Sequence, residues 1–149
     1  MITITHPTSR KMPRRGQAVV EFALILPLFV LLVFGALELG RAMLRVHLLN
    51  NAVREGARVG TLPGSLEQDV ANKVSSFLQL QGMAAGTWTT TVTVTAPDGT
   101  ARAGGLASAL QGDLVKVTLT NQFNVLTGSI IPGFLGTKTL TANCVFRHE

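Results

Sequence analysis

Two kinds of hydrophobic pattern divide this chain of 149 residues into a long helical region and a region of strands. Residues 22–37 contain no charged side chain, and with their flanks they form a largely apolar stretch from Ala18 to Leu39. About 20 helical residues cross the hydrocarbon core of a bilayer, so this stretch predicts one membrane span. A basic stretch, residues 10–15, precedes it. Such charges hold their end of a span in the cytoplasm, so we expect a cytoplasmic N-terminus.

Beyond the span, apolar side chains recur at every third or fourth position, which is the period of one helical face. This stripe consists of Leu39, Met43, Val46, Leu49, Val53 and Ala57. We therefore expect one helix over residues 17–60, whose second half packs through the stripe on a folded domain. Gly56 and Gly60 lie four positions apart. Their spacing indicates close packing of the helix end on a sheet or, alternatively, a specific docking site. Pro63 and Gly64 then end the helix.

Residues 61–149 predict a small α+β domain that carries the sheet. Residues 65–80 have helical spacing, and Ser65 with Gln68 three positions later predicts a capping box at the start of a short helix. Strict alternation of apolar and polar residues predicts three strands. These strands cover residues 88–95, 113–123 and 138–147. The apolar face of the resulting antiparallel sheet would lie on the stripe of the long helix.

Two loops of the domain differ in composition. Residues 100–112 are small and glycine-rich, so we expect a mobile loop. Residues 130–135 are apolar and either cover the core or contact a partner.

The net charge of +5 is concentrated in the first part of the chain. Residues 1–60 hold eight Lys or Arg and three Asp or Glu, whereas residues 61–149 hold five of each kind. A protein that reads nucleic acid carries its basic patch on the folded domain. This distribution therefore argues against a nucleic-acid partner and fits a protein held at a lipid bilayer.

The sequence lacks the usual catalytic and metal-binding patterns. Cys144 is the one cysteine, and the three histidines are scattered without the spacing of a zinc site. We expect no catalytic residue, no metal and no cofactor. Two alternatives remain open at this point. The apolar stretch could be a cleaved secretory signal, or the outer domain could be an enzyme or a ligand-binding domain on a membrane anchor.

Two residues of the predicted span are unusual for a membrane helix. Glu21 lies just inside its start, five positions after Gly16. An ionisable group in a membrane helix costs about 3 kcal/mol or more, so its presence there indicates a function. Pro27 removes one helical hydrogen bond. It is either an ordinary transmembrane proline or a weak point where the helix bends or melts on leaving lipid.

These residues carry a resemblance to a known family. Residues 16–22 read Gly-Gln-Ala-Val-Val-Glu-Phe, Pro27 follows, and residues 51–58 read Asn-Ala-Val-Arg-Glu-Gly-Ala-Arg. Over about residues 16–60 the chain resembles the TadE-like family of the tight-adherence (Tad/Flp) pilus system. Residues 114–147 are similar, less distinctively, to the sheet region of such proteins. One departure is Phe22, where the pilin motif usually has tyrosine.

The resemblance implies a pilin-like fold and a bacterial minor pilin or pseudopilin in the inner membrane, with its folded domain on the periplasmic side. It implies that a prepilin peptidase removes a basic leader, residues 1–16, by cutting after Gly16. Gln17 would then supply a free α-amino group, and a neighbouring or its own amine would neutralise Glu21 inside a filament. An unpaired buried charge would be strongly destabilising there.

The same resemblance implies the partners of the chain. They are other pilin or pseudopilin subunits, the prepilin peptidase, the inner-membrane assembly platform of the pilus and the lipid bilayer. Glu21, Phe22 and Pro27 would serve assembly through the N-terminal helix. The alternative is an uncut, single-span assembly factor of the same pilus or secretion machinery.

Overall fold

The computed structural model describes residues 15–125 and 136–149. The chain falls into two units that divide within its long helix, between Ala36 and Leu37. We call residues 1–36 the N-terminal unit and residues 37–149 the C-terminal unit. The apolar loop expected at residues 130–135 and most of the basic leader lie outside the described residues.

The long helix α1 (Arg15–Gly60) confirms the predicted helix at both ends to within two residues. It continues through Pro27 as one element. In the N-terminal unit, every described position from Gly16 to Ala36 is exposed. Among the residues of that unit that the structure describes, none covers the apolar side chains of the predicted span.

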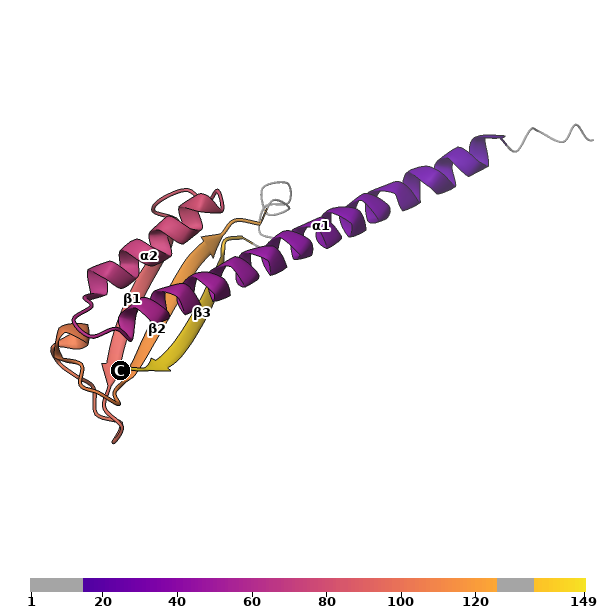
Figure 1. The fold of residues 1–149 in the computed structure, drawn as a ribbon. Helices are drawn as coiled ribbons and strands as arrows, with labels where there is room; N and C mark the ends of the chain where they lie inside the picture. Colours follow the sequence, from indigo (N-terminus) through magenta and orange to yellow (C-terminus); the bar gives the residue numbers. More distant parts are fainter. Residues whose placement is uncertain (1–14, 126–135) are drawn as a thin grey trace, which may run out of the picture. The chain divides into compact units, whose positions relative to one another are not determined.

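The C-terminal unit contains the second half of α1, a short helix α2 (Glu67–Leu80) and a three-stranded antiparallel sheet. The strands β1 (Trp88–Thr95), β2 (Leu114–Phe123) and β3 (Lys138–Arg147) lie side by side in this order. A one-turn 3-10 helix, η1 (Gly105–Ser108), lies between β1 and β2 in the chain. Figure 1 shows this α+β arrangement, which confirms the predicted fold class.

The core of the C-terminal unit forms where both helices meet one face of the sheet. The central strand contributes Val115, Val117 and Leu119, all fully buried. Their alternation in the sequence predicts this face, since side chains two positions apart point the same way in a strand. The helices contribute the remaining buried apolar residues, among them Leu49, Ala52, Val53, Ala57, Val70, Val74 and Leu78.

Gly56 and Gly60 let α1 approach its neighbours closely. A Cβ built on Gly56 would lie 2.6 Å from Val74 Cγ2 of α2. A Cβ on Gly60 would lie 3.2 Å from methyl groups of both Val70 and Val115. Both glycines are buried in the unit itself, so close packing accounts for their spacing and leaves no accessible docking site at their position.

The packing stripe of α1 is shorter than its periodicity predicts. Leu49, Val53 and Ala57 are buried, but Leu39, Met43 and Val46 are exposed. The predicted packing of these last three residues on the sheet is therefore not observed. A helical period identifies the face of a helix, but it does not report how far along the helix its partner extends.

Where the apolar contacts of α1 end, two arginines of the helix contact the end of β2. The Arg41 guanidinium lies 5.6 Å from the ring centroid of Phe123, at the end of β2. Arg45 donates a long hydrogen bond of 3.5 Å to the side-chain oxygen of buried Asn121. Both of these arginines thus contact residues near the end of β2.

Two further local predictions need correction. The short helix begins at Glu67 after the N-cap residue Leu66, whose amide donates to the Asp69 carboxylate at 2.9 Å. The predicted cap Ser65 instead donates to the carbonyl of Leu62 at 2.7 Å. An Asp three positions after the cap serves as well as the expected glutamine, because either accepts from a free helix amide.

The glycine-rich segment 100–112 is not a free loop. Leu106 in η1 belongs to the core, and Thr95 forms an isolated bridge with Ala101. The segment is fixed by two hydrogen bonds from the Arg102 guanidinium to the Asp113 carboxylate, at 2.9 and 3.1 Å. Composition misled the prediction because it carries no information on this ion pair.

Candidate functional site

The first turns of α1 bring the predicted processing and assembly residues onto one short helical segment. Gly16 lies in the first turn, and a Cβ added to it would meet nothing within 4 Å. The side-chain amide of Gln17 donates to the Glu21 carboxylate at 3.2 Å, one turn further on. Residues four apart lie on the same face of a helix. The segment is therefore open to a partner, and positions 17 and 21 face the same way.

The rest of the N-terminal unit presents apolar side chains all round. Phe22 is exposed, as are the leucines, valines and phenylalanines that follow. Within the described residues, α1 is by length and composition apolar enough to cross a membrane. Pro27 has no amide hydrogen, so the helix lacks one internal hydrogen bond inside this stretch.

The residues predicted to pack the helix on the domain fall into two groups. Val53, Gly56 and Gly60 lie in the core region, whereas Leu39, Met43 and Val46 remain exposed. The exposed group continues the apolar surface of α1 into the C-terminal unit. The structure thus does not bring all six residues together in one packing interface.

A comparison with protein families identifies the family that the sequence of α1 matches. The model of the TadE-like protein family matches residues 16–58. These residues form a TadE-like region. The match begins at Gly16 and ends two residues before the end of α1, so it covers the helix and none of the sheet.

The TadE-like match confirms the resemblance carried by residues 16–22 and 51–58. Together with the apolar helix, it fits a membrane protein associated with the Tad pilus. Neither a curated protein nor a solved structure gives a significant match to the chain. The weaker similarity of residues 114–147 lies outside the matched TadE-like region.

The ion pair between Arg102 and Asp113 serves the structure of the C-terminal unit. The Asp113 side chain is buried and also accepts a hydrogen bond of 2.9 Å from the Leu110 amide. The bonds from Arg102, and then the bond from Leu110, hold the pKa of Asp113 below its usual value. Among the described residues, no group of three or more His, Cys, Asp or Glu is placed to hold a metal ion.

A second polar cluster joins the end of α1 to the end of β3. His148 Nδ1 lies 3.2 Å from the carbonyl oxygen of Gly60, and His148 is buried. A carbonyl only accepts, so Nδ1 carries the hydrogen of this bond. The Glu149 amide donates to the carbonyl of Thr61 at 3.1 Å. Sequence patterns gave no signal for this cluster, because its partners lie far apart in the chain.

Proposed function

We propose that this chain is a minor pilin or pseudopilin of a Tad/Flp (type IV-like) pilus, cut by a prepilin peptidase after Gly16. The observation that carries the proposal is the placement of Glu21 near the start of an apolar, TadE-like helix, five positions after that glycine. The chain would reside in the inner membrane with its C-terminal unit on the periplasmic side. It would enter the filament through α1.

The geometry of the first helical turn supports a role for the new N-terminus. The Gln17 side chain reaches the Glu21 carboxylate in the intact chain, since the two positions are one turn apart. Cleavage before Gln17 would place a positive α-amino group at the start of the same helix. That amine, or the amine of a neighbouring subunit, would neutralise Glu21 when helices pack together and exclude water. The proposal thus gives the cut two consequences, release of the leader and supply of a counter-charge.

The mass of the native protein tests the cut directly. In cells with an active prepilin peptidase, we expect a mature chain that begins at Gln17. Gly16→Ala should slow or block this processing, because the added methyl group changes the residue on the amino side of the scissile bond. An intact leader in such cells would overturn the proposed cut. It would favour the uncut single-span assembly factor, the reading to which the departure at Phe22 also points.

The role of Glu21 is tested separately from the cut. Glu21→Ala should remain in the membrane and be processed, but its incorporation into filaments should fall by roughly tenfold or more, since it leaves an amine without its partner. Glu38→Ala is a matched control, because it removes another carboxylate from α1 outside the predicted counter-charge pair. Normal incorporation of the Glu21→Ala protein would contradict the counter-charge mechanism.

The proposal assigns the C-terminal unit a structural role and no catalysis. Its buried carboxylate, Asp113, is engaged in holding the fold through its pair with Arg102. Turnover of a substrate by the purified protein would contradict this part of the proposal and revive the reading of an anchored enzyme.

A further inference from the structure

The face of the sheet that points away from the core is an array of threonines. It consists of the odd positions 89–95 of β1, the even positions 114–122 of β2 and the odd positions 139–147 of β3. We call it the threonine face, because eight of its fourteen side chains are threonine. The register aligns them in rows across the strands; Thr89, Thr120 and Thr141 form one such row.

The threonine face is open and contains no carboxylate. All fourteen side chains are exposed or half-buried, while the two helices contribute to the core on the opposite face. A solvated protein surface normally intersperses charges of both signs. Here the only charged side chains are two cations, Lys116 and Arg147. Neither forms an ion pair with any described residue, including Glu149 two positions after Arg147.

The two cations lie close together at one end of the threonine face. Lys116 is directly opposite Val145, and Arg147 is directly opposite Leu114. The cations are therefore diagonal neighbours on adjacent strands, with Cα atoms about 7–8 Å apart. Long side chains at that distance can both reach one anionic group, or two groups on neighbouring units of a polymer.

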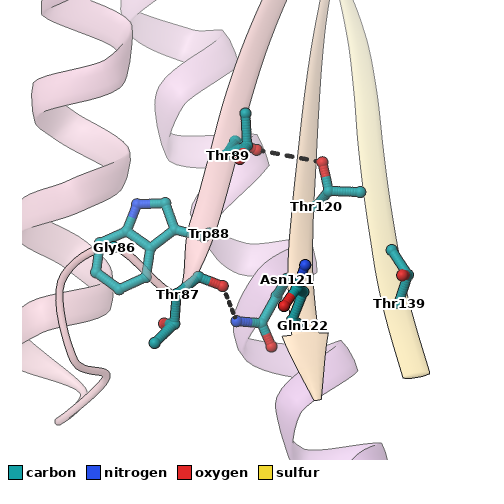
Figure 2. A pocket seen from close by; sticks show the side chains of 8 residues that line it. All are labelled: Gly86, Thr87, Trp88, Thr89, Thr120, Asn121, Gln122 and Thr139. Carbon is teal, nitrogen blue, oxygen red and sulfur yellow. Dashed lines mark hydrogen bonds between the residues drawn. The ribbon is translucent and has the colours of Figure 1, made fainter. Parts of the chain in front are cut away.

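At its other end, the threonine face contains an open depression of about 220 Å³. Figure 2 shows its walls, to which each strand contributes a threonine: Thr89, Thr120 and Thr139. The amide of Asn121 donates to the Thr87 carbonyl there and fixes the start of β1 beside the end of β2. Along β2, Lys116 lies four residue steps from Thr120 at the edge of the depression, about 13 Å.

The hydroxyls and the two cations of the threonine face favour some classes of partner over others. A threonine hydroxyl both donates and accepts hydrogen bonds, as the hydroxyls of a sugar do. Protein interfaces depend on aromatic or large buried anchors, and sites for single-stranded nucleic acid combine many cations with stacked aromatic rings. The fourteen positions of the threonine face include no aromatic residue and only two cations. The one aromatic residue that lines the depression, Trp88, belongs to the opposite face of β1 and packs against the core. A polymer rich in hydroxyls with occasional carboxylates matches it best.

We propose that the threonine face binds an acidic polysaccharide. Carboxylates of the polymer pair with Lys116 and Arg147, and its hydroxyls bond to the rows of threonine that lead to the depression. The strands hold these groups in place before binding, so little ordering is needed when the polymer docks. This binding is separate from the proposed assembly through α1, since it uses none of the residues of the N-terminal unit.

The test uses the full-length protein in nanodiscs of zwitterionic lipid, with alginate as the probe. Alginate, a polymer of uronic acids, should bind, whereas neutral dextran should not. The double variant Lys116→Gln with Arg147→Gln should bind alginate roughly tenfold more weakly, since it loses two charge-assisted contacts. The control Arg54→Gln with Lys73→Gln removes two exposed cations from the helices and should bind as the unchanged protein does.

A second variant tests the hydroxyls without changing the charge. Thr91→Val with Thr118→Val keeps the shape and strand preference of the side chains and should weaken alginate binding severalfold. Unchanged binding by this variant would overturn the role of the threonine rows. The proposal would be overturned if the unchanged protein did not bind alginate, or if it bound single-stranded DNA as tightly as alginate. It would also be overturned if the control variant on the helices lost as much alginate binding as the variant of Lys116 and Arg147. Each of these results leaves the proposed cleavage and filament role untouched, because those are measured by mass and by incorporation.

Discussion

The two halves of α1 are one continuous helix, yet they are stabilised in different ways. In the N-terminal unit, the apolar side chains of α1 are exposed all round, and no described residue of the chain covers them. In the C-terminal unit, Leu49, Val53 and Ala57 are buried by α2 and the sheet of the same chain. The difference teaches that the described chain supplies a packing partner for the second half of α1 and none for the first.

Carboxylates show the same contrast between the two units. Glu21 is exposed, and among the described residues its carboxylate accepts a hydrogen bond from the side-chain amide of Gln17. Asp113 is buried and accepts bonds from Arg102 and from the Leu110 amide. A carboxylate without a fixed cation can take its partner from another molecule, whereas one with a bidentate guanidinium is committed to its own fold.

The largest effect on this contrast is expected from a glycine in the second half of α1. Gly56→Leu should lower the free energy of unfolding of the C-terminal unit by about 3 kcal/mol, because even its Cβ overlaps Val74. Urea unfolding of the protein in detergent, followed by fluorescence of its single tryptophan, Trp88, measures this loss. Gly40→Leu is the matched control in the same helix, since a Cβ there meets nothing within 4 Å. Equal stability of the two variants would show that the close approach of α1 to α2 is not needed.

The next largest loss of stability is expected from the side-chain amide of Asn121, which bonds to the Thr87 carbonyl at the end of the sheet. Asn121→Ala should cost about 2 kcal/mol, because it leaves the Thr87 carbonyl without its hydrogen bond and opens a small cavity. The same urea titration detects it. Thr120→Ala, the neighbouring position on the opposite face, should cost clearly less. If the two substitutions cost the same, the buried bond from Asn121 contributes no more than an exposed side chain.

A smaller effect on the free energy of unfolding is expected from Asp113, and it depends on the pH. The pKa of Asp113 is lowered in the folded unit, so this carboxylate stabilises the fold above its unfolded pKa of about 3.9 and loses that contribution as the pH falls through the folded value. Asp113→Asn should therefore flatten the fall in stability below about pH 4. Asp98, whose pKa is lowered chiefly by the Thr100 hydroxyl, should leave part of the fall in place. If the stability of Asp113→Asn fell in acid as steeply as that of the unchanged protein, the Asp113 carboxylate would not be a source of this pH dependence.

The smallest effect is expected from the first half of α1. Pro27→Ala should change the free energy of unfolding of the C-terminal unit by less than about 0.5 kcal/mol, since the substitution lies outside that unit. Its effect should appear instead in the helix of the membrane span and in filament incorporation. A large loss of stability in the C-terminal unit would mean that the two halves of α1 are not independent.

Sequence patterns predicted the repeating elements well and the isolated contacts poorly. The three strands appear within one residue of their predicted bounds, because alternation reports which face of each strand is buried. The stripe of α1 gave the correct face but too great a length, since Val46 lies beyond the reach of the core. Residues 100–112 are held by the burial of Leu106 and by the ion pair between Arg102 and Asp113, among other contacts, and no periodic signal marks such contacts. At the candidate site, the sequence predicted that Gly16 and Glu21 lie near each other, because both belong to the first two turns of one helix.

The bond between His148 and the Gly60 carbonyl has a consequence for biosynthesis. It joins residues 88 positions apart, and β3 must be in place beside β2 before it can form. Contacts of such long separation are made late in folding, because the entropy of closing the intervening loop must be overcome first. A ribosome must therefore finish residue 148 before this bond can form. Until then the end of α1 lacks its connection to the residue that follows β3.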